Sequence, residues 1–315
     1  MTQTNTPQYK PPYIGRFAPS PSGPLHFGSL FCALASYLDA KKNAGQWLVR
    51  IEDIDTPRID PSMSKVILDS LRAHGLEWDD EVIYQSQRHD LYEQYLNLLN
   101  RKALLYGCSC SRKQIKQRSG FYDGHCRTRK LPFDKHALRF KHVENNTYFT
   151  DKHLGNVTIS HPIATEDSVL KRADGIYAYH LVVIADDIEQ GITHIVRGND
   201  LVETTPIHLS LFDAFDSTRP QYCHMPVLSQ KPNEKLSKQH HSPAIDDKLA
   251  ADNIKLALFL MGFKKQDIPT HNRIDQLIFW AIENWSLNIV PLKREILIST
   301  ANGVYSEFSN INEGE

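Results

Sequence analysis

The feature that most constrains the fold is a regular alternation of strand and helix patterns over the first hundred residues. Strands are expected at 13–17 and 47–52, and between them apolar residues recur at helical spacing from Phe27 onward. Further helical patterns occupy 61–75 and 88–102. Strands that alternate with helices in this way form a parallel sheet covered by helices. The sequence therefore predicts an α/β protein built on a Rossmann-type parallel sheet.

The chain divides into the first half of a Rossmann-type catalytic domain, an insert, the second half of that domain and a helical tail. The expected bounds are 1–105, 106–180, 181–245 and 246–315. The insert carries cysteines, basic residues and short strand-like pieces at 137–140 and 147–149. The tail shows helical patterns at 253–261 and 273–285, and its polar end after Ala301 is expected to be frayed.

Composition limits the classes of partner. The 315 residues carry 36 basic and 37 acidic side chains, so any contact with nucleic acid depends on a local basic surface. Five cysteines are few and odd in number, which favours metal binding or buried thiols over a disulfide framework. No apolar run approaches the roughly 20 residues of a membrane span, and the N-terminus lacks the apolar centre of a signal peptide. We expect a cytoplasmic monomer that does not contact a membrane.

The loop that joins the first strand to the first helix has the composition of a phosphate site. Residues 18–24 are rich in Pro, Ser and Gly, and His26 follows in the first turn of the helix. Ligands of such sheets bind beyond the carboxyl ends of the strands, where a helix N-terminus offers free N–H groups. Gly23 and Gly28 permit close approach of the backbone. On these residues alone, a Pro-rich surface turn with a capping histidine is an equally good interpretation.

A second candidate for phosphate binding is the segment Lys235-Leu-Ser-Lys238-Gln239, which follows an expected strand. Two lysines three residues apart can neutralise the charge that spreads over a leaving pyrophosphate. A solvated basic turn is the alternative for any single pair of lysines.

These two segments, in this order, resemble the signature motifs of class I aminoacyl-tRNA synthetases. Residues 21–29, Pro-Ser-Gly-Pro-Leu-His-Phe-Gly-Ser, are similar to the "HIGH" motif, and residues 235–239 are similar to "KMSKS". Residues 15–23, 50–55 (Arg-Ile-Glu-Asp-Ile-Asp) and 196–200 (Val-Arg-Gly-Asn-Asp) resemble the glutamyl branch of that class.

Two departures and the length of the chain narrow the resemblance. Ser29 stands where the "HIGH" pattern has its second histidine, and Gln239 stands where "KMSKS" ends in serine. The resemblance runs from about residue 13 to about residue 260, and only about 75 residues follow Gln239. Glutamyl-tRNA synthetases carry a sizeable anticodon-binding domain there. The chain therefore resembles the glutamyl-Q tRNA(Asp) synthetase family, which lacks that domain.

The resemblance implies a ligase that activates glutamate as glutamyl-adenylate with ATP and Mg²⁺. The glutamyl group then passes to queuosine in the anticodon of tRNA(Asp). His26, Lys235 and Lys238 take the catalytic roles around the phosphates, and ATP binding adds Gly28 and Ser29. Because the glutamate carboxylate is already ionised near neutral pH, the first step needs positioning and charge neutralisation and no general base.

A substrate with two carboxylates and one ammonium needs two cationic partners and one anionic partner. The glutamate-site residues that the resemblance implies are Arg16, Ser20, Glu52, Tyr179 and Arg197. Arg16 and Arg197 match the carboxylate partners, and Glu52 matches the partner of the α-ammonium. Without the resemblance, a surface Arg197 and a core Tyr179 are the simpler interpretations. The neighbouring acids to which we assign structural roles are Asp53, Asp55 and Asp187.

The insert contains a candidate metal site. Three thiolates, those of Cys108, Cys110 and Cys126, can hold zinc, and a closed tetrahedral site needs a fourth ligand. The residues alone offer two: His125, because imidazole is the commoner ligand, and Tyr122, because adjacent side chains such as those of residues 125 and 126 seldom reach one metal together. The resemblance implies the tyrosine, and hence one structural Zn²⁺. Three unrelated buried thiols are the alternative. The remaining cysteines, expected to be inert in the core, are Cys32 and Cys223.

A local excess of positive charge lies beside this metal site. Residues 112–141 hold ten basic side chains and only two acidic ones. Such an excess is typical of a surface that contacts a phosphate backbone, so we expect the insert to face tRNA. A solvated basic surface is the alternative.

Three other functions compete with this interpretation. The first is a truncated glutamyl-tRNA synthetase that charges the 3′ end of tRNA, and the second is an unrelated nucleotidyltransferase. The third is an RNA-binding module without catalysis, against which the paired Lys235 and Lys238 argue.

Overall fold

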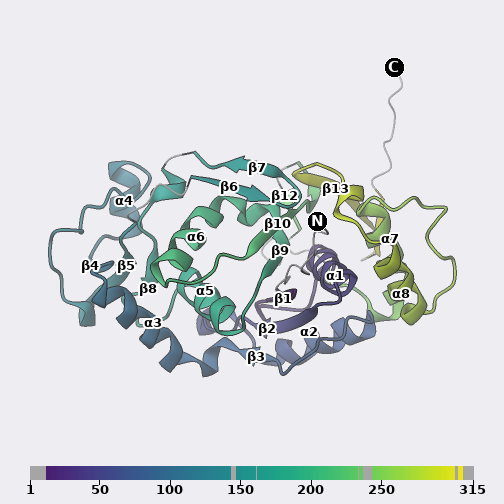
Figure 1. The fold of residues 1–315 in the computed structure, drawn as a ribbon, viewed down its shortest axis with the longest axis horizontal. Coiled ribbons are helices and arrows are strands. Elements are labelled where there is room, and N and C mark those ends of the chain that lie inside the picture. The colour runs from purple at the N-terminus through teal and green to yellow at the C-terminus, as the bar shows by residue number, and fades with distance from the viewer. Residues whose placement is uncertain are drawn as a thin grey trace, which may run out of the picture.

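The computed structural model describes residues 12–142, 147–160, 162–232, 234–236, 243–301 and 304–307. Its centre is a parallel sheet (Figure 1). The strands of this sheet are β1 (Ile14–Phe17), β2 (Gln46–Ile51) and β3 (Ile83–Tyr84) in one half, and β9 (His194–Gly198) and β10 (Gln221–Met225) in the other. The halves join where the Thr193 N–H donates to the Ile14 carbonyl at 2.9 Å. The predicted Rossmann-type parallel sheet is confirmed.

Helices cover both faces of this sheet (Figure 1). They are α1 (Phe27–Lys42), α2 (Ser62–Ala73), α3 (His89–Arg101), α5 (Tyr179–Glu189), α6 (Thr205–Ala214), α7 (Ala250–Leu260) and α8 (Ile274–Asn284). The predicted apolar stripe of α1 is fully buried, with Leu30, Phe31, Leu34 and Leu38 at 0% exposure. Burial of each such side chain is worth about 1.5–3 kcal/mol, so α1 is fixed firmly across the sheet.

The insert contributes a small antiparallel sheet at one end of the molecule (Figure 1). Its elements are β4 (Leu105–Cys108), α4 (Arg112–Arg118), β5 (Ala137–Phe140) and β8 (Val169–Lys171). The hairpin of β6 (Tyr148–Asp151) and β7 (Gly155–Thr158) pairs instead with β10, at Tyr222 opposite Asp151. Residues inside the expected insert therefore extend the catalytic sheet.

The C-terminal region contains strands as well as helices. The expectation of a purely helical tail with a frayed end is wrong for β13 (Glu295–Ala301) and β14 (Val304–Glu307). Their sheet has the order β12 (Glu234–Lys235), β11 (Val227–Lys231), β13, β14. β13 runs parallel to β11, and the Ser229 hydroxyl donates to Glu295 at 2.6 Å. The tail thus completes the sheet that leads into the second signature motif.

Short 3-10 helices connect the larger elements. They span Thr56–Arg58, Gln85–Gln87, Phe133–Lys135, Ile163–Thr165, Asn199–Thr204, Asp247–Leu249 and Leu287–Ile289. Within the described ranges, no helix combines the length and the apolar character needed to cross a bilayer.

Candidate active site

His26 caps the N-terminus of α1. Its Nδ1 accepts a hydrogen bond from the Ser29 N–H at 3.2 Å, and its Nε2 lies 3.1 Å from the Ser29 hydroxyl. Because a backbone N–H only donates, Nδ1 is the acceptor and the neutral ring carries its proton on Nε2. The first turn of α1 contains no acidic side chain, so the partial positive charge of the helix N-terminus is not neutralised there. This end of α1 suits an anionic group.

The two signature motifs meet at this helix end. A Cβ added to Gly28 would lie 3.5 Å from the Cβ of Leu236, which is the second residue of the late motif. The Leu236 N–H donates to the Leu228 carbonyl at 2.7 Å, and the Ile245 N–H donates to the Leu25 carbonyl at 3.0 Å. The chain on each side of residues 237–242 is therefore held beside the start of α1.

The described residues include the backbone of Lys235, which ends β12. Lys238 and Gln239 lie outside the described residues. Of the predicted phosphate-site residues, the structure thus brings His26, Gly28 and Ser29 together with the first residues of the late motif.

Arg16 and Arg197 occupy corresponding places in the sheet. Arg16 is near the carboxyl end of β1 and Arg197 near that of β9, the two strands where the halves of the sheet meet. In open parallel sheets this junction is where ligands bind. Each arginine is only 5% exposed, so Arg197 is not the surface residue of the simpler interpretation.

Asp187 of α5 holds Arg16. The Arg16 Nε and Nη2 donate to its two carboxylate oxygens at 3.2 and 3.5 Å. Arg50 also donates to Asp187 through Nη2, at 2.8 Å, and is fully buried. Burial raises the pKa of Asp187, but the charges of Arg16 and Arg50 lower it by more than burial raises it. The pKa is therefore below its usual value and the carboxylate stays ionised. The structural role expected for Asp187 is the support of a pocket arginine.

Arg197 is enclosed by hydrogen-bond acceptors. Its Nε donates to His224 Nε2 and its Nη1 to His208 Nδ1, both at 3.0 Å, and its Nη2 donates to Thr205 Oγ1 at 2.9 Å. The guanidinium also lies 4.9 Å from the ring centre of Tyr222. Burial together with the Arg197 charge lowers the pKa of His208 well below its usual value. These histidines are therefore neutral acceptors that fix the orientation of Arg197.

Glu52 and Tyr179 lie within reach of both arginine charges. The charges of Arg197, Glu52 and Arg16 all act on the Tyr179 phenol. Burial raises the pKa of Glu52 to about 7, although Arg50 and Arg16 oppose that shift. Glu52 lies 4.0 Å from Arg50 in the interior, and not in a surface pair. A half-ionised carboxyl beside arginine side chains suits an ammonium group that arrives together with carboxylates.

A cavity of about 1590 Å³ opens onto this site. Ser20, Glu52 and Tyr179 line its part in the catalytic domain, and Cys110 and Arg112 belong to its lining in the insert. Arg16 and Arg197 are buried close by and do not belong to the lining. The volume exceeds what an amino acid alone requires, so the cavity has room for a second group.

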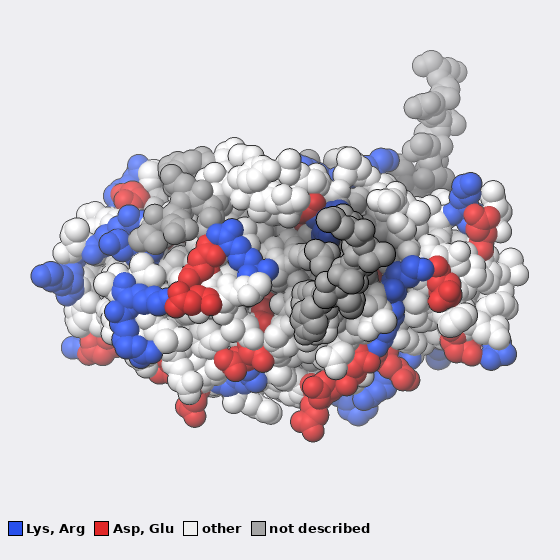
Figure 2. Space-filling model, viewed as in Figure 1, with Lys and Arg blue, Asp and Glu red and all other residues white. Residues whose placement is uncertain are grey.

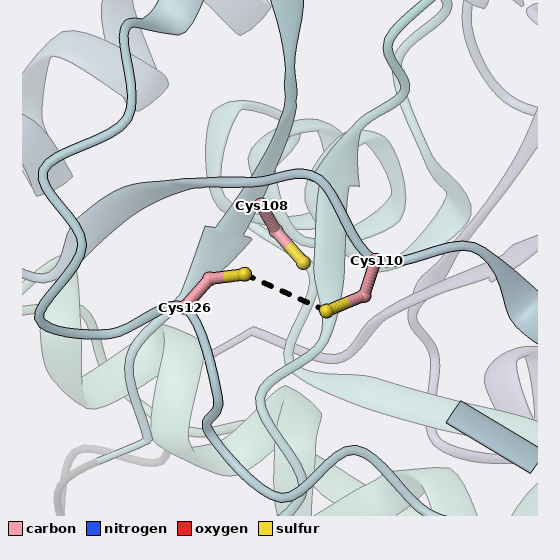
Figure 3. Close-up of side chains that lie close together, drawn as sticks. All are labelled: Cys108, Cys110 and Cys126. Atoms are coloured by element: carbon pink, nitrogen blue, oxygen red, sulfur yellow. Dashed lines mark hydrogen bonds between the residues drawn. The ribbon is translucent and has the colours of Figure 1, made fainter. Parts of the chain in front are cut away.

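The cysteines of the insert form a compact cluster. Figure 3 shows the side chains of Cys108, Cys110 and Cys126 pointing toward one another, and their Sγ atoms lie within 4.8 Å of each other. Ligands around zinc at about 2.3 Å stand roughly 3.8 Å apart, so these thiols fit a tetrahedral site. The Tyr122 hydroxyl accepts from the Cys126 N–H at 2.9 Å, whereas His125 is exposed. The Tyr122 hydroxyl therefore lies against a residue of the cluster.

The thiol chemistry agrees with this geometry. Burial raises the pKa of Cys126, but hydrogen bonds from the Ser109 backbone and from the side chains of Cys110, Tyr122 and Cys108 lower it to about 6. A thiolate is the form that binds a metal. None of the five cysteines, all of which the structure describes, forms a disulfide, and Cys223 is buried in the core.

The basic side chains of the insert lie on the surface. Figure 2 shows Lys and Arg over the end of the molecule that carries α4 and β4. No residue of α4 is buried. Arg139 is an exception to the exposed set: it is 6% exposed, and its guanidinium lies 3.8 Å from the centre of the Tyr122 ring.

Sequence reasoning missed the groups that hold the pocket arginines. Arg50 and Asp186 are completely buried, and the Arg50 Nε lies 3.6 Å from an Asp186 oxygen. His208 and His224, which accept from Arg197, were also missed. Arg50 and Asp186 stand in otherwise apolar segments of the sequence. Charged side chains in such segments are buried only when paired, so their positions could have predicted a buried ion pair.

Comparison with known proteins agrees with these observations. The family model described as "tRNA synthetases class I (E and Q), catalytic domain" matches residues 14–266. The chain is 45% identical over 298 residues to a glutamyl-Q tRNA(Asp) synthetase of Pectobacterium atrosepticum, covering 94% of this chain and 92% of that protein. It is also 45% identical to one of Vibrio vulnificus, covering 92% and 95% respectively.

Solved structures of class I aminoacyl-tRNA synthetases are also similar to this chain, at lower sequence identity. A glutamate-tRNA synthetase from Elizabethkingia anophelis is similar with a TM-score of 0.74 and 26% identity, covering 90% of this chain and 67% of that one. A methionyl-tRNA synthetase from Mycobacterium tuberculosis has a TM-score of 0.52 at 10% identity, over 80% and 64% of the two chains, which indicates a shared fold alone.

Proposed function

The chain belongs to the glutamyl-Q tRNA(Asp) synthetases within the class I synthetase family, and on that basis we propose its reaction. It uses ATP to activate glutamate as glutamyl-adenylate and transfers the glutamyl group to queuosine in the anticodon of tRNA(Asp). The observation that carries the proposal is the convergence of Arg16, Arg197 and Glu52 on Tyr179. Asp187, the other anion that acts on Tyr179, is already paired with Arg16 and Arg50. Two arginines and one carboxyl therefore remain to match a dicarboxylic amino acid with one ammonium group.

The first step is the attack of the α-carboxylate of glutamate on the α-phosphorus of ATP, with pyrophosphate as the leaving group. Glu52 holds the α-ammonium, and Arg16 and Arg197 hold carboxylate oxygens, so that the attacking oxygen is oriented. His26 donates through Nε2 to the phosphates at the N-terminus of α1, where no acidic side chain offsets the partial positive charge of the helix. Lys235 and Lys238 neutralise the leaving pyrophosphate, and Mg²⁺ supplies further charge neutralisation when bound.

In the second step, a hydroxyl of the queuosine cyclopentene-diol attacks the carbonyl carbon of the adenylate. An ester bond forms, the bond from the carbonyl carbon to the phosphate oxygen breaks, and AMP leaves with the hydroxyl proton on its phosphate. The cavity that runs from Glu52 to the insert supports this step, because it has room for a nucleoside beside the amino acid. The basic surface of the insert is the candidate contact for the tRNA backbone.

The metal that we propose for the insert is one structural Zn²⁺. Cys108, Cys110, Cys126 and Tyr122 are its ligands, because the thiols are compact and the tyrosine hydroxyl lies against Cys126. Zinc there would fix the loop of residues 109–126 to β4, and so hold the insert in place beside the cavity.

The decisive experiment supplies ATP, labelled glutamate and tRNA(Asp) either with or without queuosine. We expect acid-precipitable label only with the queuosine-containing tRNA. A truncated glutamyl-tRNA synthetase would label the 3′ end of both tRNAs equally, and an unrelated nucleotidyltransferase would label neither. Periodate oxidation is unsuitable as a control because it attacks both the queuosine diol and the 3′ ribose.

A further inference from the structure

His180, a residue that the proposed reaction leaves unused, lines the cavity beside the amino-acid pocket. It is the second residue of α5 and lines the same cavity as Tyr179. Its Nδ1 is 3.1 Å from Nε2 of His208, and Nδ1 of His208 is 3.0 Å from Nη1 of Arg197. A chain of three side chains thus connects the buried arginine to the cavity.

The direction of every hydrogen bond in this chain is fixed. A guanidinium can only donate, so His208 accepts from Arg197 through Nδ1. A neutral imidazole has one N–H, which in His208 must therefore be on Nε2, and it donates to His180 Nδ1. The same rule then puts the single proton of His180 on Nε2. Arg197 sets the tautomer of a residue that it does not touch.

Both histidines are neutral under ordinary conditions. Burial, and then the charge of Arg197, lower the pKa of His180 to about 4. The same two causes lower the pKa of His208 well below its usual value. The ordering of the protons therefore holds across the physiological pH range.

The Nε2–H of His180 has no hydrogen-bond partner among the described residues, and it is not a buried unpaired atom. The Tyr179 hydroxyl, next along the cavity wall, is in the same situation. These two donors lie on the first turn of α5, which no side chain caps. A helix N-terminus with free donors on its first turn favours a negatively charged acceptor.

We propose that His180 donates its Nε2–H to the side-chain carboxylate of bound glutamate and thereby selects this carboxylate against the amide of glutamine. The inference rests on the proposed function, since it assigns a further contact in the same pocket. The guanidinium groups of Arg16 and Arg197 and the Nε2–H of His180 can only donate, so a carboxylate satisfies them with its oxygens. An amide would direct its NH₂ group at one of these donors, and a site built for one hydrogen-bond pattern rejects the other strongly.

The test is a pair of substitutions at His180. In His180→Gln the side-chain amide reaches the position of Nε2 and rotates to present either NH₂ or oxygen, so it accommodates a substrate amide. In His180→Phe the ring is kept and the donor is removed. Both variants are compared with the wild type in ATP–pyrophosphate exchange driven by glutamate or by glutamine.

We expect the ratio of kcat/KM for glutamate over glutamine to fall at least about 10-fold in His180→Gln. In His180→Phe we expect kcat/KM for glutamate to fall roughly 10–100-fold while KM for ATP is unchanged. His194→Gln is the matched control, because His194 is also half-buried and also contacts a tyrosine ring, that of Tyr13, with the ring centres 3.8 Å apart. It lies outside the cavity lining, so its ratio should equal that of the wild type.

A second measurement reads the tautomer in the wild-type protein and uses a variant only to assign the signal. Nitrogen-15 NMR of histidine-labelled wild-type protein distinguishes the two neutral tautomers, and the His180→Phe spectrum identifies the His180 signal. We expect the Nε2–H form for His180. The Nδ1–H form, or a glutamate-to-glutamine ratio that stays at the wild-type value in His180→Gln, would overturn the inference. Absence of glutamate-driven exchange in the wild type would instead contradict the proposed function itself.

Discussion

Leu236 packs beside Gly28, so the second signature motif begins where the first one ends. Only 3.5 Å separate the Leu236 Cβ from the place that a Cβ on Gly28 would take, and that Cβ would lie 3.2 Å from the His26 ring. The contact is so tight that a methyl group added at residue 28 would need its neighbours to shift slightly. A larger side chain there would force the two motifs apart.

Graded substitutions of Gly28 test this contact. We expect Gly28→Ala to raise KM for ATP only slightly, because the His26 ring can shift by a few tenths of an ångström. We expect Gly28→Leu to raise it about 10-fold or more, since the larger side chain displaces Leu236. Steady-state pyrophosphate exchange at varied ATP measures both effects, and equal KM values in the two variants would contradict the packing argument.

Lys238→Ala tests the late motif directly. Removal of a charge that neutralises leaving pyrophosphate should lower kcat of glutamate-driven exchange about 100-fold, with a smaller change in KM for glutamate. Lys231→Ala is the matched control, because Lys231 is an exposed lysine on the neighbouring strand β11. Exchange that survives the loss of Lys238 would remove this residue from the mechanism.

Asp187→Asn tests the support of Arg16. The amide keeps the size of the side chain but no longer balances Arg16 and Arg50, both of which are buried. We expect kcat/KM for glutamate to fall about 100-fold and the protein to lose about 3–5 kcal/mol of stability, as when a buried ion pair loses one partner. The control Asp213→Asn breaks the surface pair with Arg219 and should cost less than about 1 kcal/mol. Thermal unfolding and exchange kinetics together check this prediction.

Glutamate binding should depend on pH through Glu52. Because burial raises the pKa of this carboxyl to about 7, it is mostly protonated below that pH and cannot hold the α-ammonium. We expect kcat/KM for glutamate to rise between pH 6 and 8, with an apparent pKa of about 7. In Glu52→Gln the activity should be low and this dependence absent.

Ionisation of Glu52, which should favour glutamate binding, should lower the stability of the folded protein. A pKa that is higher in the folded protein than the usual 4.5 means that ionisation of Glu52 costs folding free energy. The contribution of Glu52 to stability is therefore lost as the pH rises from 4.5 to about 7. Comparing the pH dependence of the melting temperature between wild type and Glu52→Gln isolates it, and a difference of the reverse sign would contradict the assignment.

Removal of the metal should affect the two steps unequally. We expect purified protein to hold one zinc per chain, and chelation or Cys126→Ser to abolish transfer to tRNA while glutamate-driven exchange persists within about 10-fold. Cys32→Ala is the control, since Cys32 is a half-buried cysteine of α1 far from the cluster in sequence. Mass spectrometry measures the zinc content, and the exchange and transfer assays measure the two steps. Equal loss of both steps would contradict a role of the metal that is confined to the insert.

The elements that were predictable from the sequence are those with a local cause. The helix from Phe27 is predicted by the helical spacing of the apolar residues Leu30, Phe31, Leu34 and Leu38. Its start is fixed locally, by the cap from His26 to the Ser29 N–H three residues later. The cysteine cluster was visible because its members are close in sequence. Neither inference required knowledge of a distant partner.

The rest depends on contacts between distant parts of the chain. β13 forms because β11, some 66 residues earlier at the Ser229–Glu295 pair, offers it an edge. β6 pairs with β10 across a separation of 71 residues, and the buried His224 finds Asp151 at 2.7 Å only because of that pairing. Periodicity within a short window carries no information about such partners. The role of His208 was likewise not predictable from the local sequence, because it depends on the hydrogen bond from Arg197.

The buried ionic cluster behind the pocket restricts how this enzyme can evolve. Arg50, which touches no predicted substrate atom, is shared by Asp186 and Asp187, and Asp187 is shared in turn with Arg16. Loss of Arg16 alone would leave Asp187 to be balanced by Arg50, which also pairs with the buried Asp186, at a cost in stability. A change of preferred amino acid would therefore involve several of these positions together, because the pocket arginine and the interior acids balance one another.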